Sequence, residues 1–172
     1  LDVVKSSLES NTTGVGNVAI GRYTLAANTT ANGNTAVGGY DGSAQPALRV
    51  NTTGASNTGI GSGALSANTT ANNNTAVGYK ALFSSTTSSE NVAIGADALA
   101  DQTTGANNVA VGRATLTNNT TAGSNTAVGH EAGFTNITSQ YNAFFGRQAG
   151  YYATGGANTF IGQQAGVAVT SG

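Results

Sequence analysis

Asn74-Thr75-Ala76-Val77-Gly78 is the stretch that decides how this chain of 172 residues is organised. The same pattern returns throughout the sequence: Asn, then in most copies Thr or Val, a small residue, Val or Ile, and Gly. Its opening asparagines are Asn17, Asn34, Asn57, Asn74, Asn91, Asn108, Asn125, Asn142 and Asn158. Their spacings are 17, 23, 17, 17, 17, 17, 17 and 16 residues, a regularity that is typical of repeat architectures.

The repeat predicts a single all-β domain over residues 1–172, a parallel β-solenoid (β-roll) of about nine coils with a 17-residue period. Strand alternation places Val18 and Ile20 on one face and the small Ala19 on the other. We expect the β-branched face to form the core, together with the Leu of a recurrent Ala-Leu pair in a second short strand. The closing Gly suits a turn with positive φ. The recurrent Asn either forms a ladder of hydrogen bonds between coils or only initiates a turn.

Composition excludes several classes of protein. Charged residues make up 8% of the chain and its net charge is −1, so the basic footprint of a nucleic-acid-binding protein is missing. There is no Cys, hence no disulfide framework and no thiolate metal site. No apolar run approaches the roughly 20 residues of a membrane helix, so we expect no direct membrane insertion. Leu8 matches the Leu of later repeats, which suggests that the chain begins inside a repeat, as a fragment of a longer fibre.

Two departures from the repeat are candidate contact sites. An inserted loop at residues 39–44 contains Tyr40 and Asp41 and must project from a turn; it is either a contact loop or a tolerated surface insertion. The C-terminal coils, residues 134–172, hold seven of the eleven Tyr and Phe residues, and Ala-Gly replaces Ala-Leu there, which suggests repacking. Tyr151 and Tyr152 lie where other repeats are polar. They either contact a ligand or partner or cap the last coil.

The predicted core is thin for a unit of this length. Burying about three large apolar side chains stabilises each coil by about 5–9 kcal/mol, whereas ordering the chain costs about 1–2 kcal/mol of conformational entropy for each residue. A second apolar interface would offset the difference, and we expect the Ala/Gly face to supply it by packing against other copies of the chain. A core this thin favours an oligomer but does not fix the number of chains.

The motifs at residues 17–21 and 91–95 resemble the head repeats of trimeric autotransporter adhesins, the YadA-like head. The resemblance extends from Leu8 to about Gly166. It implies a left-handed β-roll, three chains side by side as a homotrimer, and binding to host matrix or cell surfaces. The 17-residue period is longer than is usual in that family, and Thr often replaces the first Val. Similar repeats are found in phage tail fibres and bacterial surface fibres, which leaves the parent system open.

No constellation of catalytic residues stands out. His130, the only His, occupies a variable polar position and is interpreted as a surface residue. In an extended strand, His130 and Glu131 would point to opposite faces. The acidic residues show neither the paired-carboxylate spacing of a hydrolase nor a metal-ligand spacing. We therefore predict that the chain is not an enzyme and uses no catalytic residues, metal or cofactor.

The leading hypothesis is a non-enzymatic trimeric fibre or adhesin head, extracellular on a cell surface or in a virion fibre. It would attach to a cell-surface glycan or protein receptor. The ligand-binding candidates are Tyr40, Asp41, Tyr151 and Tyr152. The alternative is a purely structural fibre spacer, with recognition elsewhere in the parent protein. A third hypothesis, an ice-binding solenoid, rests on the recurrent Thr-Thr pairs, although adjacent residues in a strand point to opposite faces.

Overall fold

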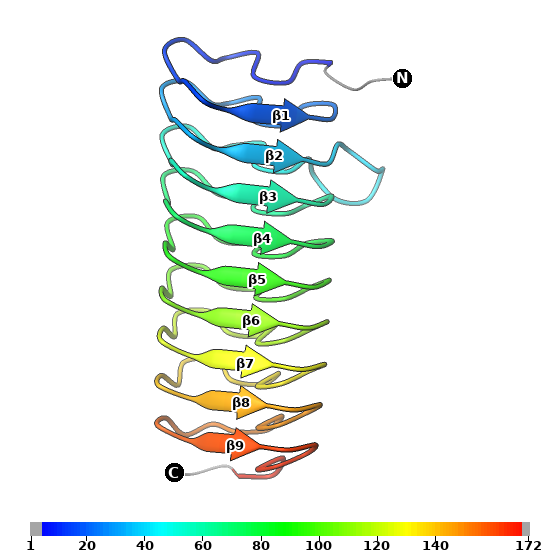
Figure 1. Cartoon of the computed structure of the whole chain (residues 1–172), viewed down its shortest axis with the longest axis vertical. Helices are drawn as coiled ribbons and strands as arrows, with labels where there is room; N and C mark the ends of the chain where they lie inside the picture. The colour runs from blue at the N-terminus through cyan, green and yellow to red at the C-terminus, as the bar shows by residue number, and fades with distance from the viewer. Residues whose placement is uncertain (1–4, 170–172) are drawn as a thin grey trace.

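The computed structural model describes residues 5–169 as a rod of stacked coils, each of which contributes one short strand to a single parallel sheet (Figure 1). The strands are β1 (Val18–Ile20), β2 (Thr35–Val37), β3 (Thr58–Ile60), β4 (Thr75–Val77), β5 (Val92–Ile94), β6 (Val109–Val111), β7 (Thr126–Val128), β8 (Ala143–Phe145) and β9 (Thr159–Ile161). They lie in the sheet in sequence order. The predicted parallel β-solenoid is confirmed; the two ends of the predicted 1–172 domain lie outside the described residues.

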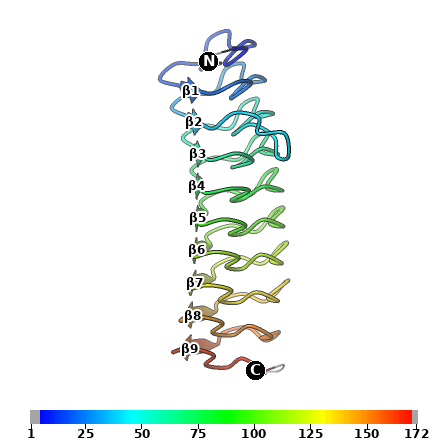
Figure 2. The same cartoon turned by 90° about the vertical axis from the view of Figure 1, so that its right-hand side faces the viewer.

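The coil is left-handed. Each strand runs from left to right on the near side of Figure 1, and the chain returns behind it to begin the next strand one step lower. Figure 2 shows the strands at one edge of the rod and the return path on the other side. The strand register holds across the irregular intervals as well, since Val37 pairs with Ile60 and Ala143 with Thr159. Insertions and deletions are therefore absorbed outside the sheet.

The face of the sheet that lines the core is the opposite of the predicted one. The central residue of each strand points inward, and Ala36, Ala76 and Ala93 are fully buried. The flanking residues point outward, so that Val18 is 46% and Ile20 45% exposed. The prediction that the β-branched face forms the core and the Ala/Gly face the second interface was wrong. The physical reason is the flatness of the coil: the inward strand residue meets the opposite wall directly, leaving room for little more than a methyl group.

That opposite wall carries the leucines, which are inward and buried as predicted, but it is built of turns instead of a second strand. Leu99 has a φ of 50°, and the equivalent leucines share this left-handed conformation. A left-handed backbone costs an L-residue about 1–2 kcal/mol. Main-chain hydrogen bonds between coils hold the wall in place: the N–H of Leu82 donates to Ala98 at 3.0 Å and that of Leu99 to Thr115 at 3.0 Å.

Asparagine ladders run along the rod, which confirms the ladder interpretation of the motif. The N–H of Asn91 donates to Oδ1 of Asn74 at 3.0 Å, and the N–H of Asn108 donates to Oδ1 of Asn91 at 2.9 Å. A second ladder stands at the corner after the Leu, where Nδ2 of Asn68 donates to Oδ1 of Asn51 at 2.7 Å. The second ladder stops at Asn68, because Ser85 stands at the next position and leaves the Asn68 Oδ1 without a partner. Where the ladders are continuous, the buried and hydrogen-bonded amides fix the spacing and rotation of successive coils.

The glycine that closes each motif is required by both conformation and space. Gly78 has a φ of 138°, in the region that side chains rarely adopt. A Cβ on Gly78 would lie 2.5 Å from the carbonyl oxygen of Gly95 in the next coil. The predicted positive-φ turn is confirmed, and it is also a point where neighbouring coils touch backbone to backbone.

The C-terminal coils are repacked, as their composition suggested. Phe144 occupies the inward position of β8, is fully buried and stacks on Phe160 at 5.7 Å between ring centroids. A Cβ on Gly133 or Gly150 would lie 2.6 Å or 2.5 Å from the Phe144 ring. The ring thus fills the space that Leu occupies in the earlier coils, and the Leu positions become Gly. The exchange conserves core volume across the coil, because a large strand residue is matched by a small wall residue.

Candidate functional site

The outward face of the sheet is an uninterrupted uncharged surface along the described rod, and we call it the sheet face. Its members are Val18, Ile20, Thr35, Val37, Thr58, Ile60, Thr75, Val77, Val92, Ile94, Val109, Val111, Thr126, Val128, Ala143, Phe145, Thr159 and Ile161. Each of them is at least partly exposed. Ile94 in the middle of the row is 41% exposed, and Ile161 is 73% exposed. A contiguous apolar face of this kind is typical of protein–protein contacts.

The inserted loop, residues 39–44, projects between β2 and β3, as predicted (Figure 1). The Asp41 carboxylate accepts hydrogen bonds from the backbone N–H groups of Ala44 and Ser43, both at 2.8 Å. These two bonds hold the pKa of Asp41 below its usual value. Asp41 therefore shapes the loop itself, whereas the Tyr40 ring is 53% exposed. A hollow of about 260 Å³ beside the loop is lined by Tyr23, Tyr40, Gln45, Pro46 and Arg49.

The C-terminal aromatic residues form a cluster on the outside of the leucine wall. The rings of Phe134 and Tyr151 are stacked, with centroids 5.0 Å apart, and Tyr152 packs edge-on against Tyr151 at 4.6 Å. Burial, and then the nearby charge of Glu131, raises the pKa of Tyr151. The cluster lies along the side of the rod and β9 follows it, so it does not cover the end of the last coil. Tyr152 remains 54% exposed and available for contact.

The structure does not bring the two candidate sites together. The inserted loop precedes β3, and Tyr151 follows β8. Six coils separate Tyr40 from Tyr151, which corresponds to about 29 Å at about 4.8 Å per coil. Within one chain they are independent surfaces.

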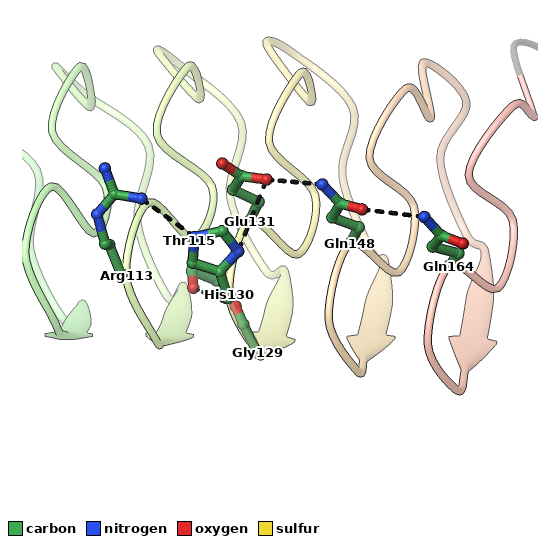
Figure 3. Close-up of polar contacts among 7 residues, drawn as sticks. All are labelled: Arg113, Thr115, Gly129, His130, Glu131, Gln148 and Gln164. Carbon is green, nitrogen blue, oxygen red and sulfur yellow. Dashed lines mark hydrogen bonds and ion pairs between the residues drawn. The ribbon is translucent and has the colours of Figure 1, made fainter.

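A chain of polar side chains crosses four coils beside the aromatic cluster (Figure 3). Arg113 Nη1 lies 3.1 Å from His130 Nε2, and His130 Nδ1 lies 3.6 Å from Glu131 Oε2. Gln148 Nε2 donates to Glu131 at 2.8 Å, and Gln164 Nε2 donates to Gln148 at 3.2 Å. The expectation that His130 and Glu131 point to opposite faces was wrong, because this segment is a turn in which Glu131 has a φ of 57°. The row ties coils together on the surface.

The Thr-Thr pairs are used unequally. The first hydroxyl of a pair donates to a carbonyl of the next coil, as Thr52 does to Thr69 at 3.1 Å and Thr103 to Thr120 at 2.9 Å. The second Thr of each pair, such as Thr53 or Thr104, is exposed. Over successive coils, the second Thr residues therefore form one fully exposed row of hydroxyls, and the pairs do not present two parallel rows.

Among residues 5–169, no three or more His, Cys, Asp or Glu side chains are grouped so as to hold a metal ion. No segment in the same range is a helix with the length and apolarity needed to cross a membrane. Comparison of the chain with protein-family models, with curated proteins and with solved structures found no match.

Proposed function

We propose that this chain is a non-enzymatic segment of a trimeric extracellular fibre, an adhesin-type head that attaches to a cell surface or glycan. The observation that carries the proposal is the sheet face, a row made mainly of Val, Ile and Thr that runs the length of the nine-stranded sheet without a charge. Left in water, this row would be a long apolar strip on an otherwise polar rod. A second copy of the chain is the partner that matches its length and periodicity.

The choice of three chains rests on the resemblance to YadA-like head repeats. The flat sheet and strict register support it, because equivalent strands on each copy can meet at the same height around a common axis. Three sheet faces turned toward one axis would bury most of the exposed Val and Ile. The leucine wall, the inserted loop and the aromatic cluster would then face outward in three copies, an arrangement that favours multivalent attachment.

The test of assembly is the absolute mass in solution by light scattering after size exclusion. One chain is 16.8 kDa, and a mass about three times larger is expected. Ile94→Lys places a charge in the middle of the sheet face and is expected to yield folded monomers, because a buried unpaired charge is costly. Thr104→Lys, on an exposed corner, is the matched control and should stay trimeric. A wild-type monomer would refute the trimer.

The test of attachment uses the predicted contact residues. Tyr40→Ala and the double variant Tyr151→Ala/Tyr152→Ala are compared with wild type for binding to cultured cells. Loss of binding in either variant supports an adhesin head with that contact site. Trimers that do not bind at all support the alternative, a structural fibre spacer. Absence of thermal hysteresis would remove the ice-binding hypothesis.

A further inference from the structure

A groove on the leucine wall lies outside every predicted site. This open groove has a volume of about 550 Å³, within the range of small-molecule sites, about 300–1,000 Å³. Four successive coils line it, and the charged residues of the lining are Lys80, Asp97, Asp101, Arg113 and Glu131. The hollow exists because one outward position of the wall alternates in size, with Phe83 and Phe134 at either end and Ala100 and Thr117 between them.

The two rings are walls of the groove. Phe134 stacks on Tyr151 of the following coil with only 12° between the ring planes, so its other face is turned back toward Thr117 and the groove. Phe83 stands three coils earlier, about 14 Å away along the rod. Allowing for the thickness of the rings, roughly 10 Å of free length remains over Ala100 and Thr117.

The groove also contains polar groups that the chain itself leaves unused. Among the described residues, the carboxylates of Asp97 and Asp101 make no hydrogen bond or ion pair. The Lys80 ammonium lies over the rings of Tyr79 and Phe83, 5.2 Å and 5.5 Å from their centroids, with no hydrogen-bond acceptor in the same part of the chain. The two carboxylates therefore stand free as acceptors between the rings, and the Lys80 ammonium, held over Tyr79 and Phe83, still has unused N–H donors.

We propose that this groove binds a short neutral oligosaccharide. A saccharide combines apolar C–H faces, which suit aromatic rings, with hydroxyl groups, which donate to carboxylates and accept from an ammonium group. Three carboxylates (Asp97, Asp101, Glu131) outweigh two cations (Lys80, Arg113) in the lining, and this balance disfavours an anionic sugar.

An extended peptide fits less well. The wall is built of turns, and several of its main-chain groups are already paired between coils, as for Asp97 N–H to Tyr79 O at 2.9 Å and Asp101 N–H to Thr117 O at 3.1 Å. It therefore offers no strand edge for strand addition. The inference rests on the proposed attachment function and assigns it a site. The groove belongs to a single chain, however, and does not need the trimer.

The experiment measures the labelled protein on an array of neutral oligosaccharides and their sialylated counterparts, followed by calorimetric titration of the best free neutral oligosaccharide. Ala100→Phe should fill the groove without removing any wall residue, and a ring there can stack on Phe83 as Tyr151 stacks on Phe134. Ala100→Ser keeps the groove open, since Ser66 stands at the equivalent position. Tyr141→Asn removes an exposed ring elsewhere, at a left-handed position that Asn73 and Asn107 also occupy.

Wild type, Ala100→Ser and Tyr141→Asn are expected to bind alike. Ala100→Phe and Asp101→Asn should weaken the titrated affinity by about tenfold or more. The monomeric Ile94→Lys variant should keep that affinity and lose only avidity on the array. Trilysine, a short cationic peptide, is titrated as the competing ligand class. Any of four results overturns the assignment: no saccharide binding by wild type, unchanged binding by Ala100→Phe, binding to sialylated sugars alone, or binding of trilysine without binding of any saccharide. If the wild type is a trimer that binds no saccharide, only the groove proposal is refuted. If it is a monomer that binds a saccharide, only the trimer proposal is refuted.

Discussion

The asparagine ladder gives the sharpest prediction about stability, and Asn91 lies near its middle. Its Nδ2 is 3.1 Å from the carbonyl oxygens of Gly105 and Ser89, and its Oδ1 accepts the N–H of Asn108 at 2.9 Å. Asn91→Ala removes that acceptor and leaves the Asn108 N–H buried without its partner. Some partners keep other bonds, since Asn108 Nδ2 still donates to Ala122 at 2.9 Å.

The expected cost follows from these contacts. One buried unsatisfied donor costs about 1–3 kcal/mol, and each further lost hydrogen bond costs about 0.5–1.5 kcal/mol. We expect Asn91→Ala to lower the free energy of unfolding by roughly 2–4 kcal/mol per chain. The assay is urea unfolding at one fixed chain concentration, with hydrogen exchange of the Asn108 amide as the local readout.

Asn118→Ala is the control for that experiment. Asn118 is partly exposed, its side chain makes no hydrogen bond among the described residues, and Ala27 and Ala67 stand at equivalent positions. Its effect should stay within about 0.5 kcal/mol. Equal unfolding midpoints for Asn91→Ala and Asn118→Ala would refute the view that the ladder stabilises the stack.

The isosteric change Asn91→Asp adds a prediction about pH. An ionised Asp would place a second oxygen against the carbonyls of Gly105 and Ser89, so the folded state should favour the protonated acid, which can donate as Nδ2 does. A folded pKa raised above the ordinary value of about 3.9 stabilises the fold at pH below that value, and the gain is lost as pH rises through the folded pKa. Unfolding measured from pH 3 to 7 should show this variant, unlike wild type, losing stability as pH rises.

Two further predictions concern the C-terminal core and the inserted loop. Phe144→Ala should destabilise the chain by about 3–5 kcal/mol. Adding Gly133→Leu should recover part of that loss, because it restores the Leu and Ala pairing of earlier coils. If the double variant is no more stable than Phe144→Ala in thermal unfolding, the volume exchange is contradicted. The lowered pKa of Asp41 means that its bonds to Ser43 and Ala44 persist above its ordinary value of 3.8 and are lost as pH falls through the lower folded value; amide shifts of Ser43 and Ala44 that do not move on acidification below pH 3.8 would contradict this.

The sequence predicted the path of the chain better than the direction of its side chains. The 17-residue period, the β-branched motif and the closing Gly were enough for a parallel solenoid with a buried Leu and a projecting loop at residues 39–44. Alternation separates Val18 and Ile20 from Ala19, but it does not say which of the two faces is inside. Hydrophobicity alone favours the bulkier face, and this preference led to the wrong assignment. The informative residue was Phe144, which stands at the central strand position where earlier repeats have Ala or Gly. In the same coils the Leu position becomes Gly, and this exchange is expected only if the central strand position and the Leu position share one core.

The leucine wall was beyond prediction for a different reason. A run such as Lys80-Ala81-Leu82 has no turn-forming residue, yet Lys80 and Leu82 both have left-handed φ values, 53° and 49°. Local propensity argues against such a conformation, and hydrogen bonds to the neighbouring coils impose it. The groove depends on this wall, because turns set Phe83 and Phe134 in one outward row. The sequence signal was available: equivalent positions hold Phe, Ala, Thr and Phe in four successive repeats.

The reversal of the two sheet faces strengthens the argument for association. With alanine inward, a typical coil buries one Leu and two or three Ala side chains of its own, less apolar surface than the sequence suggested. The internal asparagine ladders satisfy most of the buried amide groups: each hydrogen bond adds only about 0.5–1.5 kcal/mol net, although breaking one costs more because a buried partner is left unsatisfied. The β-branched residues that were expected to stabilise each coil from inside are instead collected on one outward face. They can contribute to folding only when something apolar covers them, so folding and assembly should be coupled in this chain. A surface charge such as that of Ile94→Lys should then lower stability as well as mass, and the wild-type unfolding midpoint should rise with chain concentration. A midpoint that does not depend on concentration would place the stability within one chain and leave the sheet face without a structural purpose.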